Sequence, residues 1–246
     1  MTTARPAALK LHVEQEHRIG KTQEFLKEIV YGGNDGIVTT FAIVAGFAGA
    51  HADGVAVIGG VAVLLFGLAN LFADATAMGL GAFLSVRSEQ DVYRATRATE
   101  LHEIKHHPEM ERLETIEILL ANGLSEQEAE TFADILARHP EFMADFMMNY
   151  EIEMADPTGD SPAMKGAATF IAFVVFGSAP LLPYFFTAPS PGVFQASLAL
   201  SILALVALGM LRWKATNETI ARCVGESLLV GGICGAVAFA VGLAFA

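Results

Sequence analysis

Five long apolar runs, separated by polar links, occupy most of the 246-residue chain. A helix needs about 20 mostly apolar residues to cross the hydrocarbon core of a bilayer. The runs are close to that length or longer, and they lie at about 35–52, 54–86, 163–186, 192–211 and 221–246. The pattern therefore predicts an all-α, polytopic membrane protein with five transmembrane helices.

A polar insert, residues 88–160, separates the second run from the third, and its sequence is typical of helices. Its second helix should begin at Pro108 and end before Gly123, which are common start and stop residues. Ser125 and Glu128 form a capping-box pattern at the start of a third helix. Pro140 should kink or interrupt that helix, because proline lacks a backbone N–H. We therefore expect a three-helix cytoplasmic insert.

The domain organisation follows from these runs. Residues 22–30 place Phe25, Leu26, Ile29 and Val30 on one face, which indicates a short amphipathic helix at the membrane surface. The expected domains are a cytoplasmic N-terminus with this helix at 1–33, transmembrane helices 1 and 2 at 34–87, the acidic insert at 88–160, and transmembrane helices 3 to 5 at 161–246.

The basic residues predict the orientation of the spans. The links at 51–53 and 187–192 contain no Lys or Arg, whereas Lys and Arg flank the opposite ends of the spans. The first 20 residues lack the apolar core of a signal peptide. The positive-inside rule therefore places the N-terminus, the insert and the 212–222 link in the cytoplasm, and the C-terminus outside. The basic residues used are Lys21, Lys27, Arg87, Lys165, Arg212, Lys214 and Arg222.

Composition supports the membrane prediction and shows where the charge lies. The chain is 53% hydrophobic and 17% charged, with a mean hydropathy of +0.47, which is too apolar for an ordinary soluble domain. Its net charge is −12, and the insert alone contains 18 Asp and Glu residues against 5 Lys and Arg residues. Such an insert argues against nucleic acid as a partner and favours cations.

Polar residues within the apolar runs are candidates for a transport pathway. Asn70, Asp74 and Met78 recur at intervals of four residues, so they share one helical face. A buried charge costs several kcal/mol unless it lines a water-filled path or is paired, and the second run contains no Lys or Arg that could pair with Asp74. The alternative is a protonated Asp74 that hydrogen-bonds another helix. Asp35 begins the first run, and Glu226 in the fifth is either a pathway residue or an interfacial one.

The insert carries a second candidate site, for metal ions. Two carboxylate pairs at spacing i, i+3 and a Met-Met pair followed by a glutamate could bind a cation. Thioether ligands favour a transition metal such as Fe²⁺ over Mg²⁺ or Ca²⁺. Alternatively, the carboxylates form solvated faces and the methionines belong to a core. The candidate ligands are Glu100, Glu103, Glu111, Glu114, Met147, Met148 and Glu151.

Histidines in the insert raise a different possibility. Glu103 with His106, and Glu14 with His17, have the ExxH spacing of di-iron bundle proteins. A membrane-anchored di-iron oxidase is therefore one alternative, although the two motifs are far apart and chance is the simpler explanation. A metal-sensing or storage protein without transport is another. The sequence assigns no role to His102 and His107.

Several stretches resemble the vacuolar iron transporter family. They are DGIVTTFAIVAGFAGA at 35–50, ATAMGLGAFLSVRSEQ at 75–90, GSAPLLPY at 177–184 and ESLLVGGICGAVAFAVG at 226–242. The resemblance implies a proton-coupled exporter of Fe²⁺, often also of Mn²⁺, rather than an enzyme. It implies a homodimer with its pathway between the protomers, fed by a cytoplasmic metal-binding domain. Asp35, Met78 and the seven insert residues above match positions that carry these roles in the family.

The chain departs from the family at Asn70, where well-studied eukaryotic members have a glutamate. Asp74, one turn later and about 6 Å along the helix, is a plausible replacement. No eukaryotic targeting feature is visible, so we expect a bacterial inner membrane rather than a vacuole. The expected partners are lipid, protons and a second copy of the chain. The expected cargo is Fe²⁺, with Mn²⁺, Co²⁺ or Zn²⁺ also possible, and no organic cofactor is expected.

Overall fold

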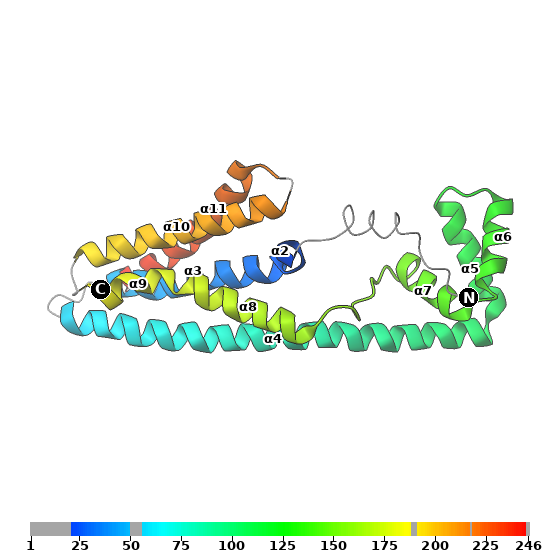
Figure 1. The fold of residues 1–246 in the computed structure, drawn as a ribbon, viewed down its shortest axis with the longest axis horizontal. Helices are drawn as coiled ribbons and strands as arrows, with labels where there is room; N and C mark the ends of the chain where they lie inside the picture. Colours follow the sequence, from blue (N-terminus) through cyan, green and yellow to red (C-terminus); the bar gives the residue numbers. More distant parts are fainter. Residues whose placement is uncertain (1–20, 50–55, 188–190, 217, 245–246) are drawn as a thin grey trace, which may run out of the picture. The chain divides into compact units, whose positions relative to one another are not determined.

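The computed structural model describes residues 21–49, 56–187, 191–216 and 218–244, and all regular elements in these ranges are helices (Figure 1). The all-α prediction is therefore confirmed for this part of the chain. The structure divides into two compact units. The membrane unit consists of Met1–Ala82 and Ala163–Ala246, and the acidic unit consists of Phe83–Pro162.

The membrane unit is built from long apolar helices. Of the five predicted spans, four coincide with helices long and apolar enough to cross a membrane in the described ranges. The exception is the first, so the fifth span stays a prediction. Its helix, α3, carries Lys27, Glu28 and Asp35 in its N-terminal half. The elements are α2 (Lys21–Glu24), α3 (Leu26–Gly49), the first part of α4 (Ala56–His106), α8 (Pro162–Gly177), η1 (Ala179–Leu181), α9 (Leu182–Phe186), α10 (Pro191–Ala215) and α11 (Ile220–Leu243).

Helix α3 lies at the centre of the membrane unit. It packs against both α10 and α11, as the ribbon shows (Figure 1). Its side chains Phe41 and Val44 join Leu71 of α4 and Phe173 of α8 in one buried apolar cluster. Asp35, on the same helix, is half-buried.

Two predicted features of the membrane unit differ in detail from the structure. The amphipathic segment at 22–30 is not a separate helix: α2 ends at Glu24 and α3 begins at Leu26, so its second half is the first turn of α3. The third span breaks where expected, at Pro180 and Pro183, into α8, η1 and α9.

The acidic unit begins within α4, which continues without interruption past the end of its apolar run at Val86. Three further helices follow, so the insert has one more helical segment than the predicted three. The predicted third helix is divided, since Pro140 cannot donate the backbone hydrogen bond of a helix interior and instead begins a new helix. The segments are the last part of α4, α5 (Pro108–Ala121), α6 (Glu126–Leu136) and α7 (Pro140–Tyr150).

Ion pairs and a small core hold the acidic unit together. Arg97 of α4 donates from Nε to Asp145 of α7 at 2.7 Å, and Arg112 of α5 donates to Asp134 of α6, also at 2.7 Å. The backbone N–H of Ser125 donates to Glu128 at 2.9 Å, as the capping-box pattern predicted. The apolar core of the unit consists of Ile104, Leu136, Met143, Ala144 and Met147.

Candidate functional site

The predicted polar face of α4 is held by a hydrogen bond. Asn70 Nδ2 donates to Asp74 Oδ2 at 2.7 Å, and both side chains are half-buried. Met78, one turn later, is also half-buried and packs against the apolar cluster of the membrane unit. The Asn70 amide therefore orients the Asp74 carboxylate. This hydrogen bond explains why an asparagine suits the position one turn before Asp74.

Asp35 of α3 and Asp74 of α4 lie within electrostatic range of each other. Like charges in a poorly solvated site repel one another. Neither makes an ion pair with a basic residue in the described ranges. Such a pair is most stable when a cation lies between the carboxylates or when one of them holds a proton.

Three of the five pathway candidates line two separate cavities of the membrane unit. Asp35 and Glu226 line a cavity of about 900 Å³, together with Lys27 and Arg212. Asn70 lines another of about 750 Å³, whose walls are otherwise apolar. Asp74 is not among the residues that line either of these cavities.

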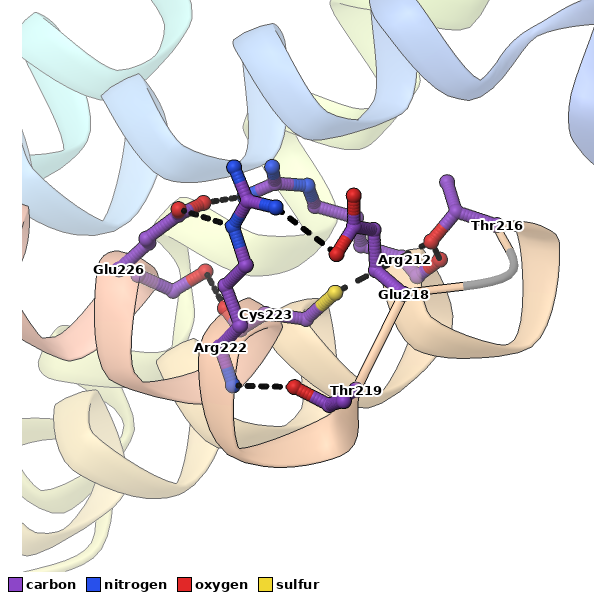
Figure 2. Close-up of polar contacts among 8 residues, drawn as sticks. Arg212, Thr216, Glu218, Thr219, Arg222, Cys223 and Glu226 are labelled. Atoms are coloured by element: carbon purple, nitrogen blue, oxygen red, sulfur yellow. Dashed lines mark hydrogen bonds and ion pairs between the residues drawn. The ribbon is translucent and has the colours of Figure 1, made fainter.

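Glu226 lies in an ion-pair network that joins α10 to α11 (Figure 2). Its Oε2 accepts from Arg212 at 2.6 Å, and its Oε1 accepts from Arg222 at 3.0 Å. Arg222 also donates to Glu218 at 2.9 Å. Both carboxylate oxygens of Glu226 are therefore occupied by guanidinium groups, so its charge is balanced without a metal ion.

The acidic unit buries two of its five predicted carboxylate ligands. Glu100 on α4 and Glu111 on α5 are only 5% and 4% exposed. Oε1 of Glu100 and Oε2 of Glu111 are buried without a donor. A buried carboxylate oxygen without a donor is costly, and a shared proton or a cation between the groups would remove that cost.

The pKa values of both buried carboxyl groups are raised, which favours a proton held by the pair. Burial raises the pKa of Glu111 to about 8, helped by the hydrogen bond and charge of Glu100 and then by Glu114 and Glu103. Burial also raises the pKa of Glu100, although its hydrogen bond with Glu111 opposes the rise. The pKa of Glu151, whose side chain is only partly buried, is raised by that partial burial and then by Glu114, Glu111 and Glu103. The five carboxyl groups thus share one electrostatic field.

The two methionines of the candidate site are fully buried on α7. The hydroxyl of Thr115, on α5, donates to the sulfur of Met147 at 3.6 Å and to the backbone oxygen of Glu111 at 2.8 Å. The sulfur of Met147 therefore faces the helix that carries Glu111. Sequence reasoning missed Thr115, although its i+4 spacing from Glu111 was a usable signal.

The structure does not draw the carboxylates into a closed metal site. No group of three or more His, Cys, Asp and Glu side chains in the described ranges has metal-binding geometry. Glu103 and Glu151 are exposed and Glu114 is half-buried, so they lie at the rim of the buried Glu100 and Glu111 pair. The ligand set stays a prediction. Of the two ExxH pairs, Glu14 and His17 lie outside the described residues.

One ion pair of the membrane unit was not predicted from the sequence. Lys165, at the start of α8, makes a largely buried ion pair with Glu28 of α3 at 3.4 Å. Its Nζ also donates to the backbone oxygen of Glu24 at 3.0 Å. Lys165 therefore fixes the beginning of α3 to α8, in addition to marking orientation. The only sequence signal was a basic residue next to an apolar run.

Comparisons with known proteins agree with this architecture. The VIT family matches residues 26–243. Vacuolar iron transporter 1 of Arabidopsis thaliana is 32% identical over 228 residues, covering 93% of this chain and 88% of the relative. Vacuolar iron transporter 1 of Tulipa gesneriana is 30% identical, and the match covers 96% of this chain and 93% of the relative. The Vacuolar iron transporter of Toxoplasma gondii is 32% identical, and the match covers 93% of this chain and 76% of the relative. The resemblance is confirmed, and the chain belongs to the VIT family.

Proposed function

We propose that this chain is a transporter that exports Fe²⁺, and also Mn²⁺, from the cytosol in exchange for protons. Its relatives are named as iron transporters and match it over nearly its full length. The observation that carries the proposal is a pair of carboxyl groups within electrostatic range of each other, Asp35 on α3 and Asp74 on α4, in a unit of apolar helices. A carboxylate pair at membrane depth is typical of an ion pathway.

The acidic unit would collect the metal before transport. Its buried Glu100 and Glu111 bind a divalent cation once the proton held by the pair is displaced. The sulfur atoms of Met147 and Met148 favour Fe²⁺ and disfavour Mg²⁺ and Ca²⁺, which prefer oxygen ligands. The rim carboxylates Glu103, Glu114 and Glu151 would complete the ligand set, taken from the family resemblance.

Protons would compete with the metal in the membrane unit. A proton that reaches Asp35 or Asp74 from outside neutralises that carboxylate and weakens its attraction for the cation. Metal release and proton uptake are then linked at the same groups. Asn70 orients Asp74, Met78 offers a soft ligand one turn away, and the arginine-paired Glu226 forms a wall of the Asp35 cavity.

The placement in the membrane follows from the same proposal. In this proposal the N-terminus and the acidic unit face the cytosol and the C-terminus faces the other side. The metal then leaves the cytosol whether the chain lies in a bacterial inner membrane or in a vacuolar membrane. Apolar residues such as Leu65, Phe66 and Leu80 are more than half exposed on α4. We propose that lipid and a second copy of the chain cover such surfaces in a homodimer.

Uptake into inside-out vesicles tests this function. Vesicles that contain the chain, with an acidic lumen, should accumulate Fe²⁺ and Mn²⁺ faster than empty vesicles, and Co²⁺ and Zn²⁺ serve as comparison ions. The double variant Asp35→Asn, Asp74→Asn should lose most of this uptake, while Asp91→Asn on the exposed part of α4 should not. Undiminished uptake in the double variant would refute the pathway. If the vesicles that contain the chain hold the same amount of metal with and without the pH gradient, the chain stores metal and does not transport it.

A further inference from the structure

Two histidines at the end of α4 lie face to face. His102 and His106 are separated by one helical turn, and their ring centroids are 3.9 Å apart with an angle of 29° between the ring planes. Both side chains are exposed. Residues at i and i+4 share one side of a helix, so the two imidazoles present their edges to the same region of solvent.

A backbone hydrogen bond determines which nitrogen of His106 is available. Nδ1 of His106 lies 2.8 Å from the backbone oxygen of His102. A carbonyl oxygen can only accept, so Nδ1 carries the proton. Nε2 of the neutral ring therefore keeps its lone pair and points away from the helix backbone. A histidine whose second nitrogen donates to a carbonyl is the usual arrangement of a metal ligand.

We propose that His102 and His106 form a separate binding site for a divalent transition metal that prefers imidazole, such as Cu²⁺, Zn²⁺ or Ni²⁺. Two histidines at positions i and i+4 share one face of a helix and can bind the same metal ion. Water fills the remaining positions. The acidic surroundings, with 18 acids and 5 bases between residues 88 and 160, attract cations.

The pair is distinct in chemistry and direction from the buried carboxylates. Glu103 follows His102 directly, so it projects about 100° around the helix axis from it. The imidazole site offers two neutral nitrogens, whereas the buried site offers carboxylates and sulfur, and these donors select different ions. The inference does not depend on transport, because it concerns binding to the acidic unit alone.

The position of the pair gives bound metal a structural effect. His106 is the last residue of α4, and α5 begins at Pro108, so the pair lies next to the corner between these helices. A metal ion that joins His102 to His106 fixes the final helical turn. That turn also contains Glu103, and α5 carries Glu111 one turn after its start. Metal on the histidines would thus stiffen the corner from which the carboxylate ligands project.

Copper titration of the purified full-length chain in detergent tests the proposal. Electron paramagnetic resonance of added Cu²⁺ should show nitrogen hyperfine coupling from two imidazoles. The variants His102→Asn and His106→Asn should each weaken this binding by about 10- to 100-fold. His139→Asn, an exposed histidine of the same unit, should bind Cu²⁺ as the wild type does. Far-ultraviolet circular dichroism of the metal-free variants checks that each is folded.

Two results would overturn the proposal. One is wild-type copper affinity and hyperfine coupling in a folded His102→Asn or His106→Asn variant. The other is loss of the nitrogen signal in Glu111→Gln, which would show that the histidines do not bind copper separately from the buried carboxylates. Retention of the signal in Glu111→Gln supports two separate sites, whatever the outcome of the transport experiment.

Discussion

At the scale of single residues, Glu111 shows how a fold changes the chemistry of a side chain. Its pKa is raised from 4.5 to about 8 by burial and by Glu100. The folded chain therefore binds more protons than the unfolded chain between these pH values. The free energy of unfolding of the metal-free chain should fall as the pH rises from about 4.5 to 8.

Thermal unfolding of the metal-free protein checks this dependence. We expect the wild-type Tm to decrease between pH 5 and pH 8 by about 5 °C or more. Glu111→Gln should flatten the decrease, because glutamine does not titrate, and Glu109→Gln, exposed on the same helix, should not. A wild-type Tm that rises over this range would show that Glu111 is ionised in the folded state.

Met147 allows a test of metal selectivity with little change in packing. Its side chain is fully buried, and leucine has a similar volume, so Met147→Leu should cost less than about 1.5 kcal/mol of stability. The variant loses only the sulfur atom that faces α5. We expect Mg²⁺ to displace bound Mn²⁺ more readily than in the wild type, as followed by the paramagnetic resonance of free Mn²⁺.

The matched control for this experiment is Met143→Leu. Met143 lies one turn earlier on α7, is also buried, and belongs to the apolar core of the unit. It should leave the competition between Mg²⁺ and Mn²⁺ unchanged. Equal behaviour of the two variants would mean that Met147 acts only as a core residue, which was the plainer interpretation of the sequence.

At the scale of elements, glycines set the distance between α3 and α8. A Cβ atom at Gly36 would lie 2.5 Å from the backbone oxygen of Phe173, and one at Gly32 would lie 2.6 Å from that of Thr169. Neither oxygen can move without shifting α8. The two helices therefore touch along their backbones, and this contact fixes Asp35, the neighbour of Gly36.

Substitution of Gly36 by alanine should separate these helices. We expect Gly36→Ala to destabilise the protein by about 1–3 kcal/mol, as overpacking does, and to reduce metal uptake because Asp35 moves. Thermal unfolding in detergent and vesicle uptake measure the two effects. Gly225→Ala in α11 is the control, because an added Cβ there meets nothing within 4 Å. A stable and active Gly36→Ala would disprove the role of this contact.

Helix positions were largely predictable from sequence, whereas contacts between helices were not. The apolar runs and the proline breaks at Pro140 and Pro180 depend on local chemistry, so they can be read along the chain. The approach of Asp35 to Asp74, and of Glu28 to Lys165, joins segments that are far apart in sequence. Periodicity identifies the face of a helix but not the helix that covers it.

The same limit applies to the candidate sites. The i, i+4 spacing of Asn70 and Asp74 predicted a shared face, and their hydrogen bond follows from it. Burial of Glu100 against Glu111 could not be predicted from the sequence. Their i, i+3 partners, Glu103 and Glu114, belong to the same pattern but are more exposed. For Glu226, the sequence left a pathway and an interfacial role open. Its two arginine partners lie on different helices.

At the scale of the whole molecule, the two units should separate metal binding from transport. Glu111→Gln in the acidic unit should weaken metal binding and slow uptake at low metal concentration, with recovery at high concentration. Asp74→Asn in the membrane unit should keep the binding and lose uptake at every concentration. Isothermal titration and vesicle uptake on the same preparations provide the comparison. Loss of binding in Asp74→Asn would contradict the division of roles.

Coupled recording of metal and proton movement in proteoliposomes tests the central claim most directly. With an acidic lumen, Mn²⁺ should enter from the face that carries the acidic unit while the lumen loses protons in step. Both signals should disappear in the Asp35→Asn, Asp74→Asn variant. Mn²⁺ entry that ignores the pH gradient, or that persists in this variant, would contradict proton-coupled transport along these two carboxylates.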